Sequence, residues 1–225
     1  MKVVVAIDSL KNSLTSVEAG RAIEAGVRKA YGGHPVQVIV KPLADGGEGT
    51  VEALVDGLNG QLRYVGVQGP LGEAVSCPYG YLPGMETAVI EMAGAAGGMG
   101  FAFLAYLNGR LRSGIQIVLD SIRLADAVKD ADYVITGEGR LDAQTAMGKA
   151  PIGVAKLAKQ YGAKVIALAG CTTADAAECN RQGIDAFFSI VDKAMPLEEA
   201  MNKETALRNM TNTAQQVFNL IRAVS

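Results

Sequence analysis

Near the start of the chain, Lys2-Val3-Val4-Val5-Ala6-Ile7 is an almost unbroken apolar run. Such a run of β-branched residues predicts a strand that is buried on both faces, as strands of parallel sheets are. Thr15 or Ser16 is then the N-cap of a predicted helix that ends at Gly32-Gly33. Residues 36–41 form the second predicted strand. The first segment therefore predicts a strand–helix–strand unit.

The alternation of strand and helix patterns continues to the end of the chain. Further strands are expected at 62–67, 87–92, 133–136, 164–169 and 186–190, and further helices at 48–58, 101–108, 113–130, 151–161, 174–182 and 196–223. Residues 113–130 also fit a strand, although the helix is favoured, and residues 72–82 contain Pro78 and predict an irregular hairpin. Strands separated by helices predict an α/β fold, here a three-layer Rossmann-like domain with a mainly parallel sheet flanked by helices. One such domain is expected over residues 1–225.

Composition and charge argue against several classes of protein. The chain is 49% hydrophobic and 20% charged with a net charge of −2, which gives no electrostatic footprint for nucleic acid or an anionic membrane. No apolar stretch approaches the roughly 20 residues that span a bilayer. The N-terminus is too short and too quickly acidic for a signal peptide. No nucleic-acid or membrane partner is therefore expected.

Cysteine and histidine usage narrows the chemistry further. The three cysteines lack metal-ligand spacing, so free thiols and a cytoplasmic location are expected. His34 is the only histidine, and it lies in Gly32-Gly33-His34-Pro35, which is typical of a surface turn. A Ser-His-Asp triad is therefore disfavoured.

Ligands of open α/β sheets bind beyond the carboxyl ends of the strands, so the residues after each strand are candidate site residues. The first strand is followed by Asp8-Ser9-Leu10-Lys11, which places a carboxylate, a hydroxyl and an ammonium group before a helix. The structural alternative is a capped helix with solvated neighbours.

The second strand is followed by Ala44-Asp45-Gly46-Gly47-Glu48. Two adjacent glycines let the backbone approach a ligand, and the next helix offers unpaired N–H groups to an anion. An acid on each side of the glycine pair suits a magnesium–phosphate site. The loop lacks the Gly-Lys-Ser/Thr ending of a Walker motif. A tight turn whose acids complement the helix dipole is the alternative.

The strand at 133–136 is followed by the longest polar loop. It holds two acids, Glu138 and Asp142, and two cations, Arg140 and Lys149, among several glycines. Phosphoryl transfer needs this mixture, with carboxylates for a metal, cations for the phosphate charge and a base for the acceptor hydroxyl. A surface salt-bridge network is the structural alternative. A nicotinamide site at the glycine cluster 94–100 is disfavoured, because the spacing is not GxGxxG.

Taken together and in this order, the loops resemble the bacterial-type glycerate kinase family over nearly the whole chain. The resemblance is carried by residues 6–14, 42–50, 69–73, 135–142 and 148–155. It implies ATP-dependent phosphorylation of D-glycerate to 2-phosphoglycerate, with Mg²⁺. One small departure is Ile7, where the family usually has proline.

The resemblance also implies roles for residues in these loops. Asp45 or Glu138 would hold magnesium, with Glu48 as a further metal ligand, and Asp8 or Asp142 would be the base. Charge on the substrate or phosphate would be met by Lys11 and Arg140. Further substrate- or phosphate-binding residues would be Ser9, Gly46, Gly47 and Lys149.

The large departure from the family lies at the centre of the chain. Family members have a domain-sized segment where Glu91-Met92-Ala93 here runs directly into Gly94. Residues 1–93 and 94–225 are therefore expected to be two family segments joined where an inserted domain was deleted, by design or by evolution. This deletion predicts impaired kinase activity, because one wall of the cleft is missing. The alternatives are an inactive domain that at most binds ligand weakly, and a homo-oligomer formed through the surface that the deletion uncovers.

Overall fold

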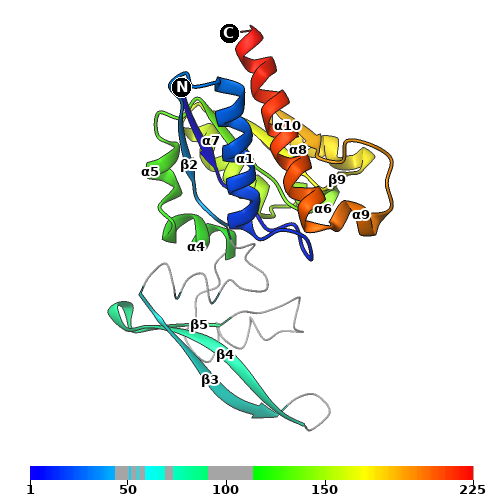
Figure 1. Cartoon of the computed structure of the whole chain (residues 1–225). Helices are drawn as coiled ribbons and strands as arrows, with labels where there is room; N and C mark the ends of the chain where they lie inside the picture. The colour runs from blue at the N-terminus through cyan, green and yellow to red at the C-terminus, as the bar shows by residue number, and fades with distance from the viewer. Residues whose placement is uncertain (44–50, 52–54, 56–58, 69–72, 91–113, 225) are drawn as a thin grey trace. The chain divides into compact units, whose positions relative to one another are not determined.

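The computed structural model describes residues 1–225 except 44–50, 52–54, 56–58, 69–72, 91–113 and 225 (Figure 1). The chain divides into two units, one of Met1–Leu43 with Arg123–Ser225 and one of Ala44–Ile122. The shorter unit carries an antiparallel sheet of its own. The single domain expected from the sequence stays a prediction.

The larger unit is built on a five-stranded sheet in which every neighbouring pair is parallel. Its strands are β1 (Lys2–Val5), β2 (Gln37–Val40), β6 (Tyr133–Thr136), β8 (Lys164–Ala169) and β10 (Ala186–Ser189). The spatial order is β10-β8-β6-β1-β2. Each strand lies inside a predicted range, so the α/β fold with a mainly parallel sheet is confirmed.

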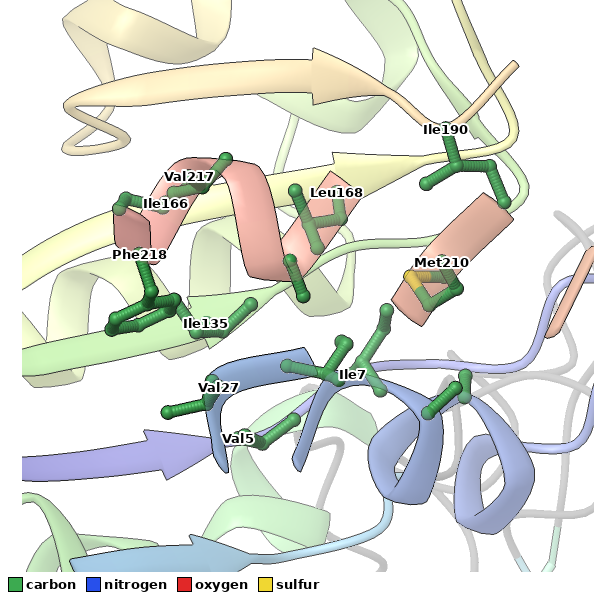
Figure 2. Close-up of a cluster of buried hydrophobic side chains, with 14 of the residues drawn as sticks. Val5, Ile7, Val27, Ile135, Ile166, Leu168, Ile190, Met210, Val217 and Phe218 are labelled. Carbon is green, nitrogen blue, oxygen red and sulfur yellow. The ribbon is translucent and has the colours of Figure 1, made fainter. Parts of the chain in front are cut away.

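Helices cover both faces of this sheet. The helices α1 (Ser16–Tyr31) and α10 (Lys203–Val224) pack on each other and on one face, where Val5, Ile7 and Ile135 point into a shared apolar cluster (Figure 2). The alternate residues Val4 and Val134 are fully buried outside that cluster, as the pleat of a strand requires. The helix α7 (Ala150–Gln160) contacts β6 and β8, and α5 (Leu124–Val128) packs on α7. The expected three layers are therefore present.

The helix α1 begins and ends where the sequence predicts. Thr15 is its N-cap and forms a capping box with Glu18, while Gly32 ends the helix in the left-handed conformation at φ 53°. Glu18 also pairs with Lys203 at the start of α10, so it joins the two helices of this layer. The hydrogen bond from Lys203, followed by those from Thr15, lowers the pKa of Glu18 to about 2.

We expect the contribution of Glu18 to stability to depend on pH. The lowered pKa means that charged Glu18 stabilises the fold fully above the ordinary glutamate pKa of 4.5, and that this contribution is lost as the pH falls through about 2. Glu18→Gln should therefore lower the urea midpoint slightly at pH 7 and progressively less below pH 4. Urea unfolding of both proteins from pH 7 to pH 2.5 measures the difference. A difference in urea midpoint that does not shrink toward pH 2.5 would contradict the lowered pKa of Glu18. Adding Lys203→Met to Glu18→Gln should lower the urea midpoint little further, because the pair is already broken.

The shorter unit contains the antiparallel sheet β3-β4-β5, with β3 (Gln61–Gln68), β4 (Ala74–Leu82) and β5 (Thr87–Val89). The expectation of an irregular hairpin at 72–82 is wrong, because β4 is a regular strand paired with β3 along its length. Pro78 pairs with Tyr64, and β5 pairs only with residues 80–82. Among the described residues β4 therefore has a neighbour on one side alone at Pro78, where a missing N–H is tolerated.

The remaining predicted elements mostly have the expected type. Residues 114–128 are helical apart from a break at 122–123, as α4 (Gly114–Ser121) and α5, and Arg123 in this break is left-handed at φ 51°. The helix expected at 174–182 consists of η2 (Ala174–Ala177) and α8 (Glu178–Arg181), and the last helix consists of α9 (Leu197–Met201) and α10. The helix expected at 101–108, most of the one at 48–58 and the glycine cluster 94–100 lie outside the described residues. None of the described helices is both long and apolar enough to cross a membrane.

Candidate active site

The strand order places a topological switch point between β1 and β6. The chain leaves β1 for β2 on one side, whereas β6 lies on the other side of β1. Ligands of open α/β sheets bind beyond the carboxyl ends of the strands at such a point. The loops that follow β1 and β6 are two of the three polar loops predicted from the sequence, so their geometry decides what the site can do.

The loop after β1 is short and closed on itself. Asp8 is only 3% exposed, and its Oδ1 accepts a hydrogen bond of 2.6 Å from the Ser9 N–H. The N–H groups of Leu10 and Leu14 each donate to the other residue's carbonyl oxygen, which holds the loop as a tight turn before α1. Lys11, at the tip of this turn, is exposed, and Ser9 is half-buried. The carboxylate of Asp8 is therefore fixed by its own loop.

The loop after β6 begins with a glycine of positive φ, which a buried glutamate follows. Gly137 has φ 152°, and Glu138 is 8% exposed. The hydroxyl of Thr145 donates a short hydrogen bond to Glu138 Oε1, and Lys149 Nζ lies 4.0 Å from Oε2. Glu138 and Lys149, both predicted from the sequence, are thus brought together. A buried carboxylate with a cation beside it is suited to binding a charged ligand.

Asp142 and Arg140 form a second pair in the same loop. Asp142 is the N-cap of the four-residue helix α6 (Ala143–Ala146), and its Oδ1 accepts from the N–H groups of Gln144 and Thr145 at 2.9 and 3.2 Å. Its Oδ2 lies 3.5 Å from Nε of Arg140, whose side chain is 63% exposed. The carboxylate of Asp142 is thus engaged in capping a helix and in a surface ion pair. This is the structural alternative for this residue.

Backbone contacts bring the loops together. The N–H of Asp8 donates to the carbonyl of Gly137 at 3.0 Å. A Cβ on Gly139 would lie 3.6 Å from the Lys11 nitrogen and 3.7 Å from Leu10 Cα, so the two loops are in contact. The loop after β8 joins them, because the backbone N–H of Cys171 donates to the carbonyl of Gly139 at 3.1 Å. This bond lies beside the small sheet of β7 (Arg140–Leu141) and β9 (Cys171–Thr172).

Four residues near this loop cluster were assigned no role from the sequence: Thr145, Thr173, Asp175 and Cys179. The hydroxyl of Thr173 donates to Asp175, which is the largest cause of the lowered pKa of that carboxyl, and the Ala143 N–H and Arg140 lower it further. Burial raises the pKa of the Cys179 thiol, and the carboxylates of Glu138, Asp142 and Asp175 raise it further. Only the capping position of Thr145, three residues after Asp142, gave a sequence signal for any of them.

Four predicted site residues, Asp45, Gly46, Gly47 and Glu48, lie outside the described residues. In the part of the chain that the structure describes, no group of three His, Cys, Asp or Glu side chains gathers that could hold a metal ion by itself. Mg²⁺ is usually held by one or two carboxylates together with substrate phosphates and water. The donor chemistry of Glu138, a buried carboxylate on the loop after β6, fits that manner of binding.

Comparison with known proteins gives a consistent result. The model of the Glycerate kinase family matches residues 3–94 and, separately, 93–222. A glycerate kinase of Bacillus subtilis is 29% identical over 378 residues, covering 99% of this chain and 98% of the relative. A glycerate kinase of Haemophilus influenzae is 50% identical over 129 residues, which are 57% of this chain but 34% of the relative.

A solved structure agrees with these relatives. The crystal structure of a protein from Salmonella typhimurium LT2 assigned as glycerate kinase 2 superposes with a TM-score of 0.73 at 26% identity. The match covers 99% of this chain and 98% of that one. The 378-residue alignment with the Bacillus protein is much longer than the 225 residues of this chain, so a long internal stretch of that relative has no counterpart here.

Proposed function

Because this chain belongs to the glycerate kinase family, we propose that its loop cluster is one wall of a phosphoryl-transfer site that converts D-glycerate and ATP to 2-phosphoglycerate and ADP. The observation that carries the proposal is the backbone hydrogen bond that the Asp8 N–H donates to the carbonyl of Gly137 across the switch point. It unites the two polar loops at the position where doubly wound sheets bind ligands.

The proposed roles follow from the environment of each side chain. In the reaction the bond between the γ-phosphorus and the oxygen of ADP breaks, a bond forms to a glycerate hydroxyl oxygen, and the hydroxyl proton passes to a base. Asp8 is our choice for the base, because Asp142 is committed to capping α6. Glu138 would hold Mg²⁺, with Asp45 as the alternative ligand that the family resemblance implies, and bound Mg²⁺ would neutralise phosphate charge. Lys11, Arg140 and Lys149 would meet the negative charge of the substrates.

The missing internal stretch supports a further part of the proposal, which is that activity is impaired. The two matches to the family meet at residues 93 and 94, as expected if an inserted segment was lost there. Phosphoryl transfer depends on donors and charges fixed around the reacting group and on exclusion of water. In water the interaction of two unit charges at 4 Å falls to about 1 kcal/mol. We therefore propose a slow kinase. We also propose that it is located in the cytoplasm.

We expect ADP release from MgATP to depend on D-glycerate and to be far slower than in the Bacillus subtilis relative measured beside it. Asp45→Asn and Glu138→Gln should abolish the release, because each removes a proposed ligand charge. The assay couples ADP formation to NADH oxidation, with circular dichroism to show that each variant is folded. If folded wild-type protein releases no ADP, the alternative of a catalytically inactive domain replaces the proposal.

A further inference from the structure

We infer that Thr145 is a positioning residue, whose hydroxyl fixes the carboxylate of Glu138 for binding a metal–phosphate ligand. The inference rests on the proposed function, since Glu138 is a metal ligand only under that proposal. Thr145 is fully buried in α6, and its hydroxyl donates to Glu138 Oε1.

The hydroxyl of Thr145 is held in one orientation by a second hydrogen bond. The backbone N–H of Asp142 donates to Thr145 Oγ1 at 3.2 Å, which occupies the oxygen as an acceptor. The single hydroxyl proton is therefore directed at Glu138. An outer hydrogen bond of this kind fixes the orientation of a ligating carboxylate, and its loss typically costs about 10–100-fold in metal affinity or activity.

The helix that carries Thr145 is anchored on two sides. The Asp142 carboxylate caps α6. On the other side, the Thr173 N–H donates at 3.1 Å to the carbonyl of Leu141, the residue before the cap. Cys179 is also buried against the carbonyl of Asp142. These contacts give α6 a fixed place although it has only four residues. A hydroxyl on so constrained a helix is suited to holding a catalytic carboxylate still.

A structural role alone makes a different prediction from a positioning role. Replacing Thr145 with valine keeps the β-branched shape and removes the hydroxyl, whereas serine keeps the hydroxyl and removes a methyl group. If Thr145 only packs, serine should harm the protein at least as much as valine. If it orients Glu138, serine should restore what valine loses.

The test combines metal binding with kinetics. Mn²⁺ in the presence of ADP is titrated into wild type, Thr145→Val, Thr145→Ser, Glu138→Gln and Thr173→Val, with free Mn²⁺ read by electron paramagnetic resonance. We expect Thr145→Val to weaken Mn²⁺ binding about 10–100-fold, with most of it recovered in Thr145→Ser. Thr173→Val is the matched control, because the Thr173 hydroxyl contacts Asp175 and the carbonyl of Leu141 rather than Glu138, and valine keeps the backbone bond to Leu141. Where turnover is measurable, kcat should fall in Thr145→Val while KM for glycerate stays close to the wild-type value.

The outcomes separate the two claims. Wild-type protein that neither binds Mn²⁺ with ADP nor releases ADP would overturn the proposed function. Wild-type binding that survives Thr145→Val unchanged, while Glu138→Gln loses it, would overturn the role of Thr145 alone. Equal losses in the valine and serine variants, with equal losses in thermal midpoint, would reduce Thr145 to a packing residue and would also overturn the inference.

Discussion

Replacing Gly137 with alanine should destabilise the larger unit more than any other single methyl group added in the candidate site. A Cβ at this position would lie 1.8 Å from the carbonyl oxygen of Leu168 and 3.2 Å from Ile7 Cδ1. The first of these atoms is backbone in β8, so relief requires β8 to move away from the residue that follows β6, directly beyond the last pair, Thr136 with Ala167. The φ of 152° adds to the cost for any residue with a Cβ.

We expect Gly137→Ala to lower the free energy of unfolding by at least about 3 kcal/mol, the upper part of the range for overpacked sites. For a chain of this length that corresponds to a fall of roughly 6–12 °C in thermal midpoint. Differential scanning calorimetry measures it. Gly139→Ala is the matched control, because its nearest atom would be 3.6 Å away, and it should stay within about 0.5 kcal/mol of wild type. A midpoint in Gly137→Ala that equals the midpoint of Gly139→Ala would show that β6 and β8 are packed differently.

The strands of the larger unit were predictable because their signal is local. The run Lys164–Ala169 is apolar after its first residue, and Gly162 and Gly170 lie near its two ends. The strand β8 begins and ends at the same residues as this run. Pro78 shows the opposite case. A proline within a run argues against a strand unless that strand lacks a neighbour on one side, and neighbours are set by pairing with residues distant in sequence.

The candidate site was predictable only in part, for the same reason. The acids and cations of each loop could be named from the sequence, but the switch point between β1 and β6 depends on the sheet order, which is fixed by tertiary packing. The sequence also left Asp8 and Asp142 as equal candidates for the base. Both carboxylates accept backbone hydrogen bonds, and our proposal of Asp8 rests on the capping of α6 by Asp142 and on the burial of Asp8 in the loop after β1.

This difference between Asp8 and Asp142 leads to a prediction with a large expected effect on activity. Asp8→Asn should lower glycerate-dependent ADP formation by at least about 100-fold, because a positioned general base typically contributes a factor of 10²–10⁴. Its amide oxygen can still accept the Ser9 N–H, so the loop should keep its shape. Asp142→Asn should retain activity within about threefold, since asparagine is as good an N-cap as aspartate. Single-turnover assays with protein in excess over radiolabelled ATP count even slow transfer.

The pair of variants is informative because both remove one charge and preserve the shape of the side chain. Both should unfold within about 1 kcal/mol of wild type, which urea titration checks and which excludes misfolding as the cause of lost activity. If Asp142→Asn abolished transfer while Asp8→Asn retained it, Asp142 would be the base and its capping bonds would serve to orient it. If both variants retained transfer, the hydroxyl proton would leave by another route, and the carboxylates at the switch point would act by binding alone.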